Sequence, residues 1–60
     1  MQYKITVYSG YFDSNPNTLT TDNYYEVQDF FEAQALEHGY DIQDYMSTEQ
    51  FTQFVKIEEC

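Results

Sequence analysis

Side chains that commonly carry enzymatic chemistry are scarce in this chain. It has one histidine, His38, one cysteine, Cys60, no arginine, and no glycine-rich loop that could cradle a phosphate. A single thiol forms neither an internal disulfide nor a cysteine-based zinc site. We therefore expect no enzymatic activity, no cofactor and no metal. His38 is interpreted as a residue near a helix C-terminus, where the helix dipole favours an imidazolium.

One run of oxygen-bearing side chains, Asp13-Ser14-Asn15-Pro16-Asn17, matches the first half of a calcium-binding EF-hand loop. The match then ends, because Thr18 replaces the glycine of the sixth position and Tyr24 replaces the bidentate glutamate of the twelfth. The same residue types are typical of turns, and we interpret the run as a turn.

Carboxylates dominate the charged residues. Eleven Asp and Glu oppose two Lys in 60 residues, which gives a formal net charge of −9 at pH 7. Between Lys4 and Lys56 there is no positively charged residue, so ion pairs within this stretch cannot neutralise its acids. Those acids are Asp13, Asp22, Glu26, Asp29, Glu32, Glu37, Asp41, Asp44 and Glu49.

This charge excludes some partners and favours others. Nucleic acids and anionic membranes are polyanions that repel such a chain, so we expect direct binding to neither. A net charge of about 2–8 keeps a small domain in solution, and the excess therefore favours a basic protein partner. No apolar run approaches the about 18 residues of a membrane span, and residues 1–4 do not begin an export signal, so we expect a cytoplasmic location.

The first third of the chain predicts strands. Tyr3–Tyr8 alternates apolar and polar side chains, which is typical of a half-buried strand. After the turn at residues 13–17, we expect Thr18–Thr21 to return as a short strand beside Tyr11-Phe12.

The strongest helix signal covers Tyr24–His38. Asn23 is placed to cap it, Glu26 follows at capping-box spacing, and Gly39 lies just past its end. At 100° per residue one side is apolar and the other acidic. The apolar side comprises Tyr24, Val27, Phe30, Phe31 and Ala35, with Gln34 and His38 at its margin. The acidic side comprises Glu26, Asp29, Glu32 and Glu37, together with Tyr25 and Leu36. We expect these last two to be covered by another segment or to form a contact surface.

The remaining residues predict a strand, a short helix and a last strand. Tyr40–Tyr45 alternates like a strand with Tyr40 and Ile42 inward, and Ser47-Thr48-Glu49-Gln50 is a capping-box pattern. Phe51–Ile57 is ambiguous, and we favour a short helix leading into a terminal strand. Residues 1–60 thus predict one α+β domain in which a sheet of two to four strands packs against one main amphipathic helix, with a βαβ-like core.

In charge, size and tyrosine content the chain resembles the small acidic inhibitors of bacteriophages and mobile elements that mimic DNA. Such proteins block restriction enzymes, CRISPR nucleases, repair enzymes or nucleoid proteins. The resemblance implies stoichiometric inhibition, in which carboxylates occupy the Lys and Arg side chains of a nucleic-acid-binding cleft and exposed tyrosines add desolvated contacts. The expected partner-binding residues are Asp22, Tyr25, Glu26, Asp29, Glu32, Leu36, Glu37, Asp41, Asp44 and Tyr45.

A second interpretation is a structural or regulatory interaction module, monomeric or homodimeric, whose acids only keep it in solution. Its binding would depend on Tyr25 and Leu36 rather than on carboxylates. A third, a small hydrolase, would require a formed pocket around His38.

Overall fold

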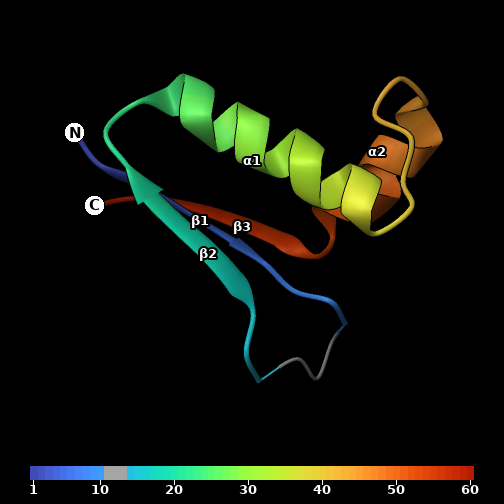
Figure 1. The fold of residues 1–60 in the computed structure, drawn as a ribbon, viewed down its shortest axis with the longest axis horizontal. Coiled ribbons are helices and arrows are strands. Elements are labelled where there is room, and N and C mark those ends of the chain that lie inside the picture. The colour runs from blue at the N-terminus through green and yellow to red at the C-terminus, as the bar shows by residue number, and fades with distance from the viewer. Residues whose placement is uncertain (11–13) are drawn as a thin grey trace.

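The computed structural model describes residues 1–10 and 14–60, which form a three-stranded antiparallel sheet and two helices (Figure 1). The elements are, in chain order, β1 (Tyr3–Val7), β2 (Asn17–Thr21), α1 (Tyr24–Glu37), α2 (Tyr45–Thr52) and β3 (Val55–Glu59). The strand order is β2-β1-β3. The α+β class, the single main helix and the short helix before a terminal strand are thereby confirmed.

Register and alternation decide which side chains of the sheet face α1. Ile5 of β1 lies opposite Leu19 of β2 and Ile57 of β3, so these three residues form one rung on the same face. Ile5 is fully buried in the core that α1 covers. Lys4, which is next to Ile5, and Lys56, which is next to Ile57, therefore lie on the opposite face of the sheet.

The returning strand, β2, lies beside β1 in the sheet. β2 pairs with β1 over Tyr3–Val7, where the ladder includes five residues on each strand. The predicted partner, Tyr11-Phe12, and the turn residue Asp13 lie outside the described residues. Pairing with β1 places Leu19 beside the buried Ile5.

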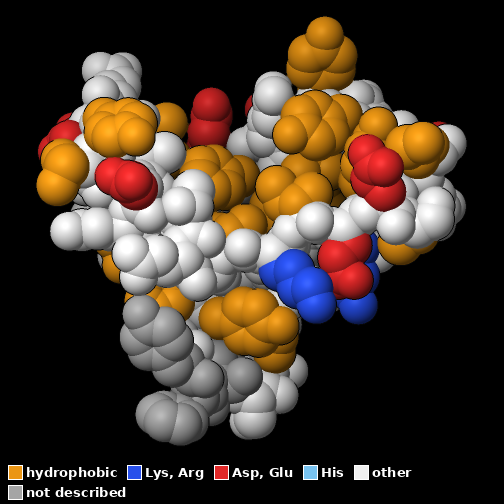
Figure 2. Space-filling view, turned by 180° about the vertical axis from the view of Figure 1, so that it is seen from behind, with side chains coloured by type: hydrophobic (Ala, Val, Ile, Leu, Met, Phe, Trp, Pro, Cys, Tyr) orange, Lys and Arg blue, Asp and Glu red, His pale blue; other side chains and the backbone are white. Residues whose placement is uncertain are grey.

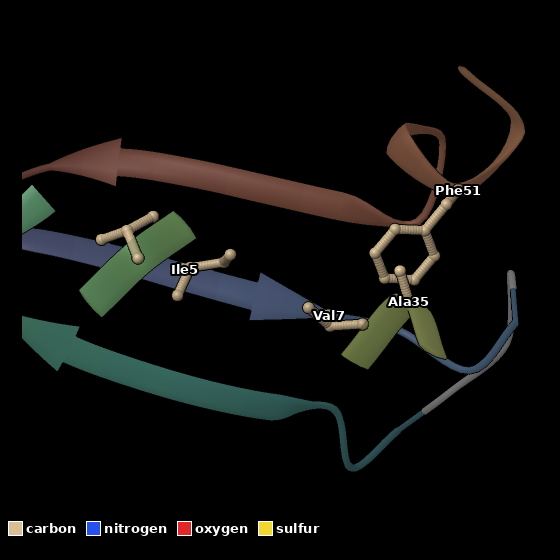
Figure 3. Packing of buried hydrophobic residues seen from close by; sticks show 5 residues of the cluster. Ile5, Val7, Ala35 and Phe51 are labelled. Atoms are coloured by element: carbon tan, nitrogen blue, oxygen red, sulfur yellow. The ribbon is translucent and has the colours of Figure 1, made fainter. Parts of the chain in front are cut away.

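Five buried apolar side chains form the centre of the core, and they come from β1 and from both helices (Figure 3). They are Ile5, Val7, Val27, Ala35 and Phe51. Phe51 of α2 reaches toward Ala35 of α1, and its ring centroid lies 5.0 Å from that of Phe31 and 5.2 Å from that of Tyr40. Aromatic rings thus fill much of the space that aliphatic residues fill in less aromatic chains.

Both ends of α1 are closed as predicted. The Asn23 side chain accepts a hydrogen bond from the Tyr25 backbone N–H at 3.0 Å. At the other end Gly39 has a φ of +86°, a left-handed conformation that favours glycine. The Tyr40 N–H then donates to the Ala35 carbonyl at 2.9 Å, which closes the helix with a Schellman turn.

The apolar side of α1 is less buried at its start than predicted. Val27 and Ala35 are buried, but Tyr24 is 45% exposed. Its ring packs edge-on against Tyr3 with the ring centroids 5.2 Å apart, at the end of the sheet where β1 begins.

The predicted strand Tyr40–Tyr45 is absent, and with it the βαβ-like core, because both neighbours of β1 are antiparallel. The Asp41 side chain instead accepts a hydrogen bond from the Gln43 backbone N–H at 3.0 Å. Such local side-chain bonds compete with strand pairing. The inward direction of Tyr40 and Ile42 is confirmed, since both pack against the core.

The start of the second helix also differs from the prediction. Asp44, rather than Ser47, is the N-cap of α2, and its side chain accepts from the Met46 N–H at 3.0 Å. Thr48 is already inside the helix, where its hydroxyl donates to the Ile42 carbonyl at 3.0 Å. Aspartate and serine are both preferred N-cap residues, and the helix begins at the first of the two along the chain.

Candidate functional site

The outward-facing line of α1 combines aromatic, acidic and aliphatic side chains. Tyr25, Asp29, Glu32 and Leu36 are spaced i, i+4, i+7 and i+11, so they follow one another along one side of the helix. All four are exposed, Tyr25 by 75% and Leu36 by 65%. We call these four residues the α1 ridge. Of the two expectations for Tyr25 and Leu36, this exposure agrees with a contact surface rather than with coverage by another segment.

Glu26 lies beside the ridge on the side of β2, and it is bound to that strand. The Thr21 hydroxyl donates to the Glu26 carboxylate at 2.5 Å and accepts from the Asn23 backbone N–H at 3.1 Å. In a capping box the glutamate would itself accept from the cap residue's N–H. Here the Thr21 hydroxyl stands between them, which joins β2 and the first turn of α1.

Glu37 lies on the same side, near the end of α1. Its carboxylate accepts from the Gln34 side-chain amide at 3.4 Å, and the Gln34 oxygen accepts from the Asn17 amide at 2.9 Å. The helical wheel alone could not predict the connection of Glu26 or of Glu37 to β2, since each depends on where that strand lies.

The remaining predicted residues fall into two groups. Asp22 precedes the cap of α1, and Asp44 and Tyr45 begin α2. All three are exposed, Tyr45 by 76%. Asp41 and Asp44 each accept a backbone hydrogen bond, so they also shape the connection between the helices. A hollow of about 410 Å³ joins this connection to the ridge, and it is lined by Glu32, Leu36, Asp41, Ile42 and Gln43.

An apolar groove lies between α1 and β3, and sequence reasoning did not find it. Its volume is about 390 Å³, and its lining residues are Tyr24, Val27, Gln28, Phe31, Glu32, Ile42 and Ile57. From the side opposite to Figure 1, hydrophobic side chains gather across the middle of the surface (Figure 2). Glu32 and Ile42 also line the neighbouring hollow, so the two depressions are continuous. Three separate segments form the groove, and no local pattern of residues could reveal it.

Positive charge is kept apart from the helices. Lys4 and Lys56 lie on the face of the sheet that points away from α1, and Lys4 stands opposite Glu58. Neither helix contains a lysine or an arginine. The side of the molecule that carries the helices therefore has negative charges with no positive side chain among them.

The other chemistry-bearing residues have simple positions. His38 is the C-cap of α1, and its backbone N–H donates to the Gln34 carbonyl at 3.0 Å. Cys60 is exposed. Among the described residues no group of three or more His, Cys, Asp or Glu side chains could hold a metal ion. Neither helix within residues 1–10 and 14–60 is long and apolar enough to cross a membrane.

The candidate site thus consists of the α1 ridge, its flanking acids and the acidic connection to α2, next to an apolar groove. Comparisons of the chain with models of protein families, with curated proteins and with solved structures found no significant match.

Proposed function

We propose that the protein inhibits a nucleic-acid-binding protein by presenting the acidic face of α1 to the basic cleft of that protein, as a mimic of DNA. The observation that carries the proposal is the separation of charge. Exposed carboxylates occupy α1 and the connection between α1 and α2, whereas Lys4 and Lys56 lie on the far face of the sheet. A Lys- and Arg-rich cleft that approaches the helices meets no competing positive charge.

The α1 ridge supports this function through its spacing. Asp29 and Glu32 are about 4.5 Å apart along the helix axis, and successive charges on one DNA strand are about 3.4 Å apart. These spacings are of the same order. A groove whose lysines and arginines bind the phosphates of DNA can therefore place them near the carboxylates of the helix. The row of carboxylates that Glu26 begins winds around the helix by about 60° per step, so it presents a curved track.

The exposed ends of the ridge add contacts that phosphates do not offer. Tyr25 and Leu36 flank the two carboxylates and are largely solvent-exposed. When a partner covers such side chains, water is excluded from the charged pairs between them and their attraction strengthens. The ridge can therefore combine charge complementarity with a desolvated anchor at each end.

The helix backbone that carries the acidic residues is also held in place before binding, as is the Glu26 side chain. α1 is capped at Asn23 and closed at Gly39, and Glu26 is hydrogen-bonded to Thr21 of β2. Groups that are already ordered lose less conformational entropy when a partner binds. This favours stoichiometric inhibition by a small protein.

The first test is affinity capture by the intact chain, followed by identification of the retained protein and a competition experiment with duplex DNA. We expect a nucleic-acid-binding protein that DNA displaces and that salt releases. Asp29→Lys and Glu32→Lys should each weaken binding on the order of ten-fold. Glu49→Lys on α2 is the matched control, because it makes the same change of charge at an exposed residue off the ridge. Equal losses in all three variants, or retention that DNA does not reduce, would contradict the proposal.

A second candidate function is an interaction module that docks through apolar surface, and it is favoured by the exposure of four large side chains on the helices. They are Tyr25, Leu36, Tyr45 and Met46, each more than 60% exposed. For such a module Tyr25→Ala and Leu36→Ala would abolish binding, while Asp29→Lys would have little effect and salt would not release the partner. The same capture experiment therefore separates the two functions.

A further inference from the structure

The outer edge of β3 carries an unused set of backbone groups. Within residues 1–10 and 14–60, β3 pairs with β1 and has no strand on its other side. The Tyr8 N–H donates to the Phe54 carbonyl at 2.8 Å and the Cys60 N–H to the Gln2 carbonyl at 2.8 Å, so even-numbered residues of this segment bond toward β1. The residues whose N–H and C=O groups point outward are therefore Val55, Ile57 and Glu59.

We propose that this edge pairs with the same edge of a second copy, antiparallel and centred on Ile57, so that two three-stranded sheets join into one of six strands. In this register the Ile57 backbone groups of the two copies bond to each other. Lys56 then lies opposite Glu58 of the second copy, and the twofold symmetry repeats the pair. These are non-hydrogen-bonded positions, where opposing Cα atoms are about 4.5 Å apart and side chains are closest.

Charge selects this register among the neighbouring ones. Centring the pair on Lys56 would set two lysines against each other, and centring it on Glu58 would set two glutamates against each other. A centre at Glu59 also opposes like charges, and a centre at Val55 leaves Lys56 without an opposite charge. Like charges directly opposite destabilise strand pairs, whereas opposite charges stabilise them. Of these registers, only the one centred on Ile57 places opposite charges, Lys56 and Glu58, against each other in the two copies of β3.

The apolar groove gives the pairing a second source of stability. Ile57 is 46% exposed because α1 lies over β1 and β2, and the groove beside Phe31 remains open. Pairing brings Ile57 against Ile57 of the second copy and buries part of both side chains. A twofold axis perpendicular to the sheet keeps both α1 helices on the same face, so the two grooves would meet there.

This dimer does not depend on the proposed inhibition. It uses the β3 edge, whereas the proposed function uses the α1 ridge, and the two share only Glu32, which lines the groove between α1 and β3. Loss of dimerisation can therefore be measured while binding of the target protein is intact. A monomeric variant with an unchanged α1 ridge tests both proposals separately.

The test is sedimentation equilibrium of the whole chain over a concentration series, with a reductant present so that Cys60 disulfides do not contribute. We expect a mass that rises from 7.2 kDa toward twice that value. Lys56→Glu and Glu58→Lys should each raise the dimer dissociation constant on the order of ten-fold, and the double variant should restore it.

Glu49→Lys is the matched control for Glu58→Lys, because both make the net charge less negative by the same amount. General repulsion between two chains of charge −9 would make both variants dimerise more strongly. The proposed register predicts weaker dimerisation for Glu58→Lys alone. Circular dichroism of each variant checks that the monomer is folded.

Amide hydrogen exchange gives an independent measure. On dimerisation the outward N–H of Ile57 should become protected, while the N–H of Lys56, already bonded to β1, should change little. Ile57→Asp should remove the dimer but leave the fold, since this side chain is half exposed in the monomer. A chain that stays monomeric at all concentrations, or a dimer that these substitutions do not affect, would overturn the proposal.

Discussion

The two strands that flank β1 are alike in length and orientation but differ in what covers them. On the rung through Ile5, Leu19 of β2 is partly buried against the core, whereas Ile57 of β3 is 46% exposed. α1 lies over β2 and leaves β3 open to solvent. The difference shows that burial in this domain is decided by where the single long helix lies rather than by the apolar character of a strand.

The chain connectivity explains where α1 lies. Only Asp22 and Asn23 separate β2 from α1, so the helix must begin beside the end of β2. The hydrogen bonds from Thr21 to Glu26 and from Asn17 to Gln34 then hold both ends of the helix to that strand. β3 arrives from α2, which covers the core mainly through Phe51.

The largest expected effect is at the centre of the rung, on β1. Ile5→Ala removes a fully buried side chain and should lower the free energy of unfolding by about 2–5 kcal/mol. A domain of this size has a stability of about 3–9 kcal/mol at roughly 0.05–0.15 kcal/mol per residue. Urea denaturation should therefore show a variant that is largely unfolded or close to it. A loss below about 1 kcal/mol would contradict the assignment of the core to the face of β1 that α1 covers.

An intermediate effect is expected for the link between β2 and α1. Thr21→Val keeps the shape of a buried side chain but removes both hydrogen bonds of its hydroxyl, and it should cost about 1–2 kcal/mol. Glu26→Met is the matched variant, because it keeps the length of the side chain but has no oxygen to accept from the Thr21 hydroxyl. A double-mutant cycle measured by urea denaturation should give a coupling between the two sites, and purely additive losses would argue against the link.

The smallest effect is expected on the open side. Ile57→Thr should cost less than about 1 kcal/mol in the monomer, because the side chain keeps about half of its exposure after folding. The measurement belongs in a Lys56→Glu background, so that dimerisation does not add to the stability. A loss as large as that of Ile5→Ala would mean that the groove is closed in solution. It would contradict the claim that β3 is less covered than β2.

Much of the fold could be predicted because its signals are local. The cap at Asn23, the glycine at 39 and the alternation in Tyr3–Val7 each depend on a few neighbouring residues. The errors concern places where two local patterns compete. Tyr40–Tyr45 has the alternation of a strand, but Asp41 and Asp44 bond to nearby backbone groups and start a helix instead.

The site could be predicted only in part, because some of its features are local and others depend on the arrangement of the strands. The composition of the α1 ridge follows from helical periodicity, and the exposure of Tyr25 and Leu36 agrees with it. The connection of Glu26 to β2 requires knowledge of the sheet. The groove beneath Ile57 and the outward N–H groups of β3 require the strand order, which no periodicity encodes.

The position of the two lysines has a kinetic consequence. Lys4 and Lys56 lie on one face and the acidic helix α1 on the other, so the molecule has an electric dipole moment as well as a net charge. The field of such a molecule turns an approaching cationic surface toward its helices before the two touch, which raises the association rate at low ionic strength. Moving a lysine from the sheet to α1 would leave the net charge unchanged and would remove that orientation.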